Sequence, residues 1–176
     1  MKNNILILIF VVIVLFLITA CESISPEDEF HKYKSEDVEP IFQRSLKLAE
    51  MGGHFTTIVD QPEEAHDYIE NDILPFLEET RGMAQDIQDT LVHQEIKDLN
   101  DITLKQLDLT ITHFSKLAEV VELHIPPVSD ASYKESEEVY VEVMEINEQI
   151  DQVIEEYNKK FEELEEKYDT QEHENL

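Results

Sequence analysis

Apolar residues recur every three or four positions through most of the chain, a spacing that places them on one face of an α-helix. Such stripes predict four helices, over residues 36–51, 60–92, 93–123 and 130–169. Gly52-Gly53 is expected to end the first helix, and Pro75 to kink or break the second. Helices joined by short loops predict an all-α fold, an antiparallel three- to four-helix bundle with a long C-terminal helix.

The last predicted helix carries residues spaced seven apart, the heptad pattern of helices that pack lengthwise. One series is Tyr133, Tyr140, Asn147, Ile154, Phe161 and Tyr168, and the other is Ser136, Val143, Ile150, Tyr157 and Leu164. Because this helix exceeds its predicted partners in length, we expect its C-terminal third to project. Its apolar residues would then need cover from the chain's own first helix or from another molecule.

Six residues of this pattern are candidates for contact with a partner: Tyr140, Asn147, Tyr157, Phe161, Leu164 and Tyr168. Tyrosine combines an apolar body with a polar tip, which suits both interfaces and the edge of a core. Core packing is expected to explain at least two of the tyrosines in the helix. Asn147 either sets the register of a packed interface or faces solvent at a gap in the packing.

An unbroken apolar run, Ile5–Ile18, precedes the helices, with Lys2 before it and small residues after it. A basic start, an apolar centre and a small-residue cleavage point are typical of a secretory signal peptide. The alternative is an uncleaved membrane anchor. Residues 5–20 are fewer than the roughly 20 that a membrane-spanning helix needs, which favours the signal peptide.

Ile18-Thr19-Ala20-Cys21 resembles the lipobox of bacterial lipoproteins, although Ile18 stands where the lipobox most often has Leu. The resemblance implies cleavage after Ala20 and attachment of diacylglycerol and fatty acyl lipid to Cys21. It implies a lipid-anchored protein on the extracytoplasmic face of the cell membrane, similar in style to small all-helical lipoproteins of Gram-positive envelopes. The expected organisation is a signal peptide (1–20), an acidic tether (21–35), the helical domain (36–169) and a polar tail (170–176).

Acidic residues dominate the composition, with 41 Asp and Glu against 13 Lys and Arg and a net charge of −28. This charge excludes nucleic-acid binding, because phosphate contacts need Lys and Arg. Repulsion also keeps the domain off an anionic lipid surface, so the lipid is the expected membrane contact. Weak binding of divalent cations is possible, without an EF-hand loop to make it specific.

Motifs for catalysis are scarce. The three glycines in the chain do not form a phosphate-binding loop. Glu63 and His66 form one Glu-x-x-His motif, whereas di-iron bundles use two, and Cys21 is the only cysteine. We therefore expect a non-catalytic module without metal or cofactor that binds a protein partner in the envelope. The alternative is an acidic protein that captures cations or cationic peptides, and a metal-dependent enzyme is the third possibility.

Overall fold

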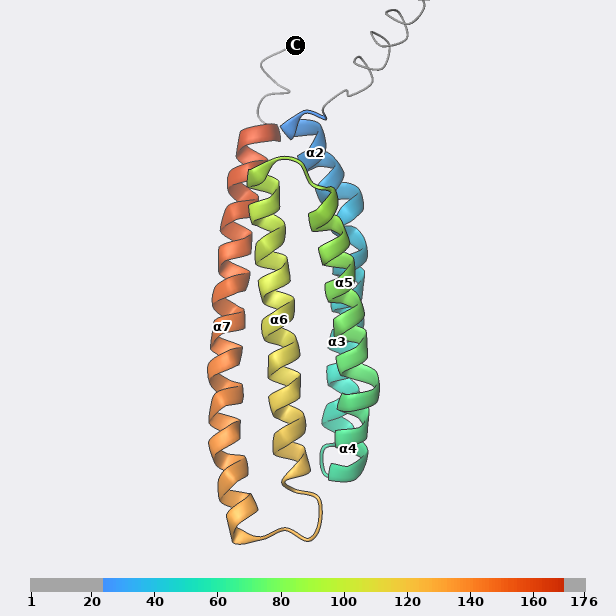
Figure 1. The fold of residues 1–176 in the computed structure, drawn as a ribbon, viewed down its shortest axis with the longest axis vertical. Coiled ribbons are helices and arrows are strands. Elements are labelled where there is room, and N and C mark those ends of the chain that lie inside the picture. Colours follow the sequence, from blue (N-terminus) through green and yellow to red (C-terminus); the bar gives the residue numbers. More distant parts are fainter. Residues whose placement is uncertain (1–23, 170–176) are drawn as a thin grey trace, which may run out of the picture.

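The computed structural model describes residues 24–169, which form four long helical stretches packed together, with no β-strand among them (Figure 1). The stretches are α2 (Pro26–Lys32), η1 (Tyr33–Asp37) and α3 (Glu39–Ile58); α4 (Pro62–Tyr68), η2 (Ile69–Ile73) and α5 (Leu74–Thr90); α6 (Gln94–Glu122); and α7 (Asp130–Asp169). None of these helices is long and apolar enough to cross a membrane. The predicted signal peptide, Ala20, Cys21 and the tail 170–176 lie outside the described residues.

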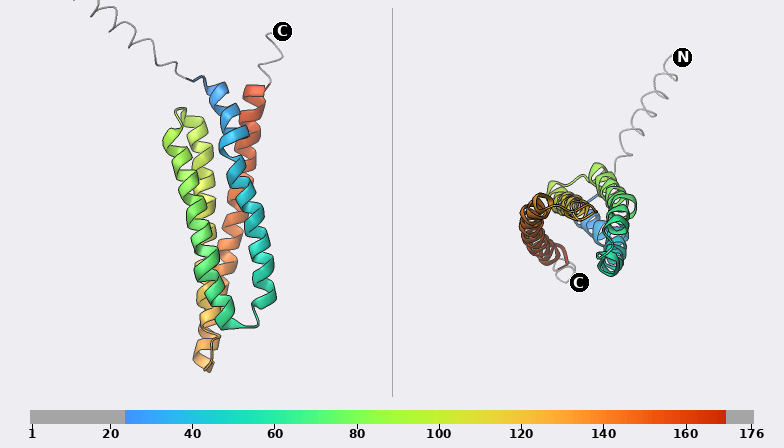
Figure 2. Two further views of the ribbon diagram at one scale, coloured as in Figure 1. Left: turned by 90° about the vertical axis from the view of Figure 1, so that its right-hand side faces the viewer. Right: turned by 90° about the horizontal axis from the view of Figure 1, so that it is seen from below.

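The long helix α7 packs along α6 and touches α2 near its own C-terminal end. The start of α2 and the end of α7 therefore lie at one end of the molecule (Figure 1). The connection between α6 and α7 lies at the opposite end, where it reaches beyond the connection between α3 and α4. The distance between α3 and α7 grows toward the end of the molecule opposite α2 (Figure 2). The part of α7 that projects is thus its N-terminal part, and not the C-terminal third.

The first two stretches share a layout that explains how each accommodates an internal proline. Each begins with a proline-led helix of seven residues, followed by a π-helical segment of five. A proline follows each segment, Pro40 after η1 and Pro75 after η2. A proline ring clashes with the carbonyl four residues earlier in an α-helix. In both stretches that carbonyl belongs to the wider π segment, so the predicted break at Pro75 takes the form of η2.

Residues 26–35, expected to form an acidic tether, are instead helical and packed into the protein. Phe30 and Tyr33 are fully buried, and Ser25 caps α2 by accepting a hydrogen bond from the Asp28 amide at 3.1 Å. Burying a large apolar side chain contributes about 1.5–3 kcal/mol, which favours docking over a free tether. The helical domain therefore begins at Pro26 and not at residue 36.

The expected helix end at Gly52-Gly53 is also wrong, because α3 continues through both glycines to Ile58. Neither glycine has a positive φ. Phe55 and Ile58, beyond them, are 8% and 6% exposed. Burying these two side chains contributes about 3–6 kcal/mol together, more than the roughly 1 kcal/mol that each glycine costs inside a helix.

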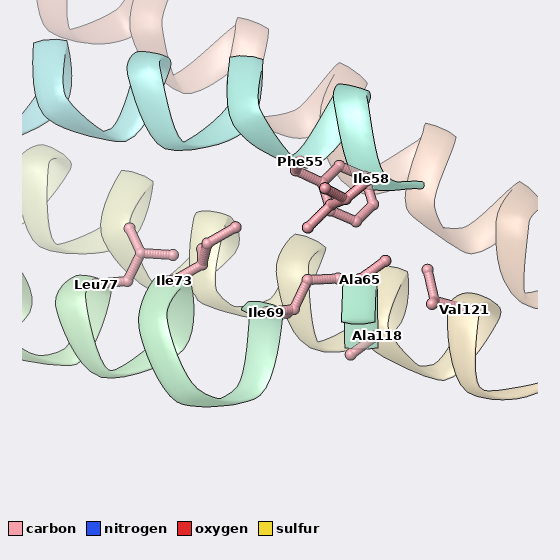
Figure 3. Close-up of a cluster of buried hydrophobic side chains, with 8 residues drawn as sticks. All are labelled: Phe55, Ile58, Ala65, Ile69, Ile73, Leu77, Ala118 and Val121. Carbon is pink, nitrogen blue, oxygen red and sulfur yellow. The ribbon is translucent and has the colours of Figure 1, made fainter. Parts of the chain in front are cut away.

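Apolar side chains form the core in three clusters along the molecule. The largest joins the end of α3 to α4, η2, α5 and the second half of α6 (Figure 3). In it Phe55 and Ile58 of α3 point toward Ala65 and the α4–α5 stretch. A middle cluster contains Ile41, Ala84 and Leu104, and the third lies at the end where α2, α6 and α7 meet. The N-terminal half of α7 belongs to none of the three.

Candidate functional site

Four of the six candidate interaction residues cover the first helix of the chain itself. Leu164 and Tyr168 are 3% and 4% exposed and pack with Phe30 and Tyr33. Tyr157 and Phe161 are partly buried against the same cluster. Leu164 and Tyr168 are thus not available to a partner in this structure. The cover comes mainly from α2 and η1, in residues expected to form the tether, and not from the helix predicted over residues 36–51.

The other two candidates, Tyr140 and Asn147, are exposed because only the second of the two predicted series is buried in the first half of α7. Ser136 and Val143 of that series are buried there together with Val139, next to α6, while Tyr133 and Tyr140 of the first series are about half exposed. A straight helix drifts about 20° per heptad from a strict seven-residue repeat. The first series therefore reaches the packed face only near the C-terminal end of α7, at Phe161 and Tyr168. Asn147 faces solvent, one of its two predicted placements.

A groove of about 360 Å³ lies where α3 and α7 diverge, and α5 and α6 form its floor. Aliphatic and aromatic side chains make up most of its lining: Val38, Ile41, Phe42, Leu48, Phe76, Leu77, Leu107, Ile154 and Tyr157. Ser45, Thr80, Thr103, Gln106, Thr110, Asn158 and Arg44 are the polar residues around it. Ligand pockets have this volume and this mixture of a mainly apolar wall with few polar groups. We call it the α3–α7 groove.

Among the residues that the structure describes, Arg44 is the only charged one that lines this groove, and its Nε and Nη2 groups are hydrogen-bonded within the protein. Its Nε donates to Thr80 Oγ1 at 2.6 Å, and its Nη2 donates to the Phe76 carbonyl at 2.9 Å. The same Nη2 lies 2.9 Å from Glu79 Oε2, and the guanidinium stacks 4.0 Å from the Phe76 ring centroid. Arg44 therefore holds α3 against α5.

One face of α7 extends the apolar surface of the groove toward the α6–α7 connection. Ile154 and Asn158 line the groove, and residues three or four apart on the same helix face continue from them. This α7 stripe consists of Tyr140, Met144, Asn147, Asp151, Ile154 and Asn158. Tyr140, Met144 and Ile154 are 50%, 49% and 37% exposed. Exposed apolar residues that adjoin a groove are typical of an interaction surface.

Carboxylates without counter-ions accompany this stripe. Glu148, Asp151, Glu155 and Glu162, the rim acids, are all exposed. Within residues 24–169 none of the four makes an ion pair, whereas the neighbouring Glu156 pairs with Lys105 at 3.1 Å. The α7 side of the groove therefore combines the exposed apolar side chains of the stripe with negative charge, from Asp151 within the stripe and from the other three rim acids beside it.

Glu29, a buried carboxylate that the sequence did not single out, joins α2 to the start of α6. Its oxygens accept hydrogen bonds from the Val92 and His93 amides at 2.7 and 2.8 Å, and His93 Nδ1 lies at 2.8 Å. Burial alone would raise the pKa of the Glu29 carboxyl, but these hydrogen bonds outweigh it and lower the pKa. Both carboxylate oxygens accept hydrogen bonds from backbone amides at the start of α6, so the role of Glu29 is structural.

Other titratable groups do not assemble a catalytic or metal centre in the described part of the chain. No set of three or more His, Cys, Asp or Glu side chains there is placed to hold a metal ion. Glu63 is exposed and His66 is half-buried on α4. Burial lowers the pKa of His113, whose Nδ1 has no hydrogen-bond partner. The geometry supports binding at the α3–α7 groove better than chemistry elsewhere.

Comparison with protein-family models finds no matching family, and comparisons with curated proteins and with solved structures find no significant match.

Proposed function

We propose that this chain is an extracytoplasmic lipoprotein that acts as a non-catalytic helical interaction module and binds a protein partner in the envelope through the α3–α7 groove. The observation that carries this proposal is the open apolar groove continued by the exposed α7 stripe. Buried interface cores are enriched in aromatic residues and Met and depleted in charge. Phe42, Tyr140 and Met144 fit that composition.

The anchoring half of the proposal rests on the lipobox-like residues 18–21. Cleavage after Ala20 leaves Cys21 at the N-terminus, with diacylglycerol and a fatty acyl group as its only modification and no other cofactor. More than one acyl chain is needed for stable anchoring. Cys21 precedes α2 by only a few residues, so the end of the bundle with α2 and the end of α7 would lie near the membrane. The α6–α7 connection would lie farthest from it.

Alternating helix directions, as in an antiparallel bundle, complete the proposed architecture. Side-by-side packing of α5 with α6 and of α6 with α7, each pair joined by a short connection, supports it. At about 1.5 Å per residue, the 40 residues of α7 span about 60 Å. The groove near Ile154 would then lie partway out from the membrane, within reach of another envelope protein.

Photo-crosslinking in membranes tests the partner. Benzoylphenylalanine replaces Phe42, which lines the groove, or Ser115, an exposed residue of α6 that does not line it. We expect a defined protein adduct from position 42, lost when Ser45→Trp fills the groove, and none from position 115. Equal adducts from both positions, or none from either, would contradict binding in the groove.

Fractionation of a Cys21→Ala variant tests the anchor. We expect loss of lipid labelling and release from the membrane, with unchanged helical content by circular dichroism. A variant that stays in the membrane fraction would contradict lipid anchoring.

Capture of cations or cationic peptides by acidity alone is the second candidate function. The net charge of −28 favours it. Attraction of this kind is spread over the surface and weakens as salt screens it. It therefore predicts salt-sensitive binding that does not depend on the groove.

A further inference from the structure

We infer that the α3–α7 groove receives an amphipathic helix whose polar face is basic. This inference rests on the proposed function and specifies its partner. Three features carry it: the length and spacing of the apolar stripe, the absence of a free cation in the groove, and the unpaired rim acids.

The dimensions of the apolar surface fit a helix. From Tyr140 to Asn158 the α7 stripe runs about 27 Å, or five helical turns. On the α3 side of the groove, Phe42 is 54% exposed. An amphipathic helix that binds in a groove inserts residues at i, i+3 or i+4, and i+7. The α7 wall, about five turns long, with an apolar hollow beside it at Ile154, matches that spacing.

The charges around the groove indicate which residues the polar face of the bound helix carries. The charge of Arg44 is already paired with Glu79, so the groove offers an acidic partner no cation that lacks a counter-ion. The rim acids, Asp151 in the stripe and the other three beside it, have no counter-ions within the described residues. Lys or Arg on the outer side of a bound helix would face them. Complementary charge of this kind speeds encounter and suppresses wrong partners.

The same charges disfavour a second copy of this chain as the occupant. Two molecules that each carry a net charge of −28 repel one another. A self-pairing of α7 stripes would also bring the rim acids of both copies together. A basic partner removes this repulsion.

Binding of synthetic helical peptides to the full chain in phosphatidylcholine nanodiscs tests the inference, with empty nanodiscs as the blank. The basic probe is a peptide of about 18 residues, five turns long, with Leu at i, i+3, i+4 and i+7 and Lys on the other face. The acidic probe has Glu in place of every Lys. We expect the basic probe to bind and the acidic probe not to bind.

Two pairs of matched variants locate the binding. Ser45 lines the groove and Ser115 does not, and each exposed hydroxyl donates to a carbonyl of its own helix. Ser45→Trp is expected to weaken the basic probe about tenfold or more, while Ser115→Trp leaves it unchanged. Neutralising Glu148, Asp151 and Glu155 together is expected to weaken it about tenfold. Neutralising Glu64, Glu70 and Asp86, exposed acids that do not line the groove, is expected to have a smaller effect.

The outcomes separate this inference from the proposed function. If both probes bind equally and Ser45→Trp blocks both, the groove is a docking site but the basic face is refuted. If both tryptophan variants and both neutralised variants behave alike, diffuse attraction by the acidic surface replaces the inference. Failure of both probes to bind also overturns it, while the crosslinking from position 42 still decides whether a protein occupies the groove.

Discussion

Replacing Glu29 by Gln is expected to lower the free energy of unfolding by about 2–4 kcal/mol. The carboxylate is almost fully buried and accepts hydrogen bonds from two backbone amides, at 2.7 and 2.8 Å, as well as lying 2.8 Å from His93 Nδ1. The Gln oxygen can accept from one amide, while its NH₂ group faces the other and leaves a buried donor unpaired. An unpaired buried donor costs about 1–3 kcal/mol, and weaker hydrogen bonds to a neutral acceptor add about 1 kcal/mol.

Urea unfolding of the full chain, followed by circular dichroism, measures this loss. Glu156→Gln is the matched control, because Glu156 and its partner Lys105 are both more than half exposed. An exposed pair of this kind contributes about 0–1 kcal/mol. Equal losses from the two substitutions would refute the docking of α2 through Glu29.

The pH dependence gives a second test of the same contact. The pKa of the Glu29 carboxyl is lowered in the folded protein. The contribution of its ionised form to the free energy of unfolding is therefore fully present above the pKa of a glutamate in the unfolded chain, about 4.3. The contribution is lost as pH falls through the folded pKa. The stability difference between Glu29→Gln and the parent protein should therefore shrink in acid. A difference that is unchanged there would contradict the assignment.

Three further substitutions test other parts of the structure by the same unfolding measurement. Phe30→Ala should lower the free energy of unfolding by about 3–5 kcal/mol, because Phe30 is fully buried. A negligible loss would show that residues 26–35 form a tether and are not packed into the bundle. Gly53→Ala should stabilise by about 0.5–1 kcal/mol, because an added Cβ meets no atom within 4 Å; destabilisation would show that α3 ends there. Burial lowers the pKa of His113 in the folded protein, so the free energy of unfolding should decrease as pH falls below about 6.5. His113→Leu should make this decrease smaller. An unchanged dependence of stability on pH would contradict the burial of a neutral His113.

The sequence predicts the two C-terminal helices well because their boundaries are set locally. Pro126-Pro127 separates α6 from α7, and the observed ranges, Gln94–Glu122 and Asp130–Asp169, match those predicted to within one residue. Ser129 and Ser132 cap α7 through reciprocal hydrogen bonds at 2.9 and 3.1 Å. Helix boundaries that are set by neighbouring residues in this way can be predicted from the sequence without knowledge of the fold.

The errors at the N-terminal end have a common physical cause, which is that distant packing overrides local signals. Acidic composition and Pro26 suggested a tether, but Phe30 and Tyr33 find partners more than 60 residues away, on α6 and α7. Gly52-Gly53 suggested a helix end, but the burial of Phe55 and Ile58 carries α3 past it. Neither set of contacts can be inferred from neighbouring residues.

The groove could not be predicted from the sequence either, although two of its features have sequence signals. Ile154 and Tyr140 appeared in the heptad series, but a strict repeat of seven assigned them to a packed face. The 20° drift per heptad of a straight helix turns that series away from α6. The divergence of α3 from α7, which opens the groove, depends on how all the helices pack together.

Methyl NMR of the full chain with the basic peptide locates the bound helix on the protein itself. If the groove is the docking site, the methyl resonances of Ile41 and Ile154, which line it, will shift on titration. Those of Ile58 and Ile96, buried in the clusters toward the two ends of the bundle, will stay in place. Shifts confined to residues outside the groove, or spread evenly over all four isoleucines, would contradict binding between α3 and α7.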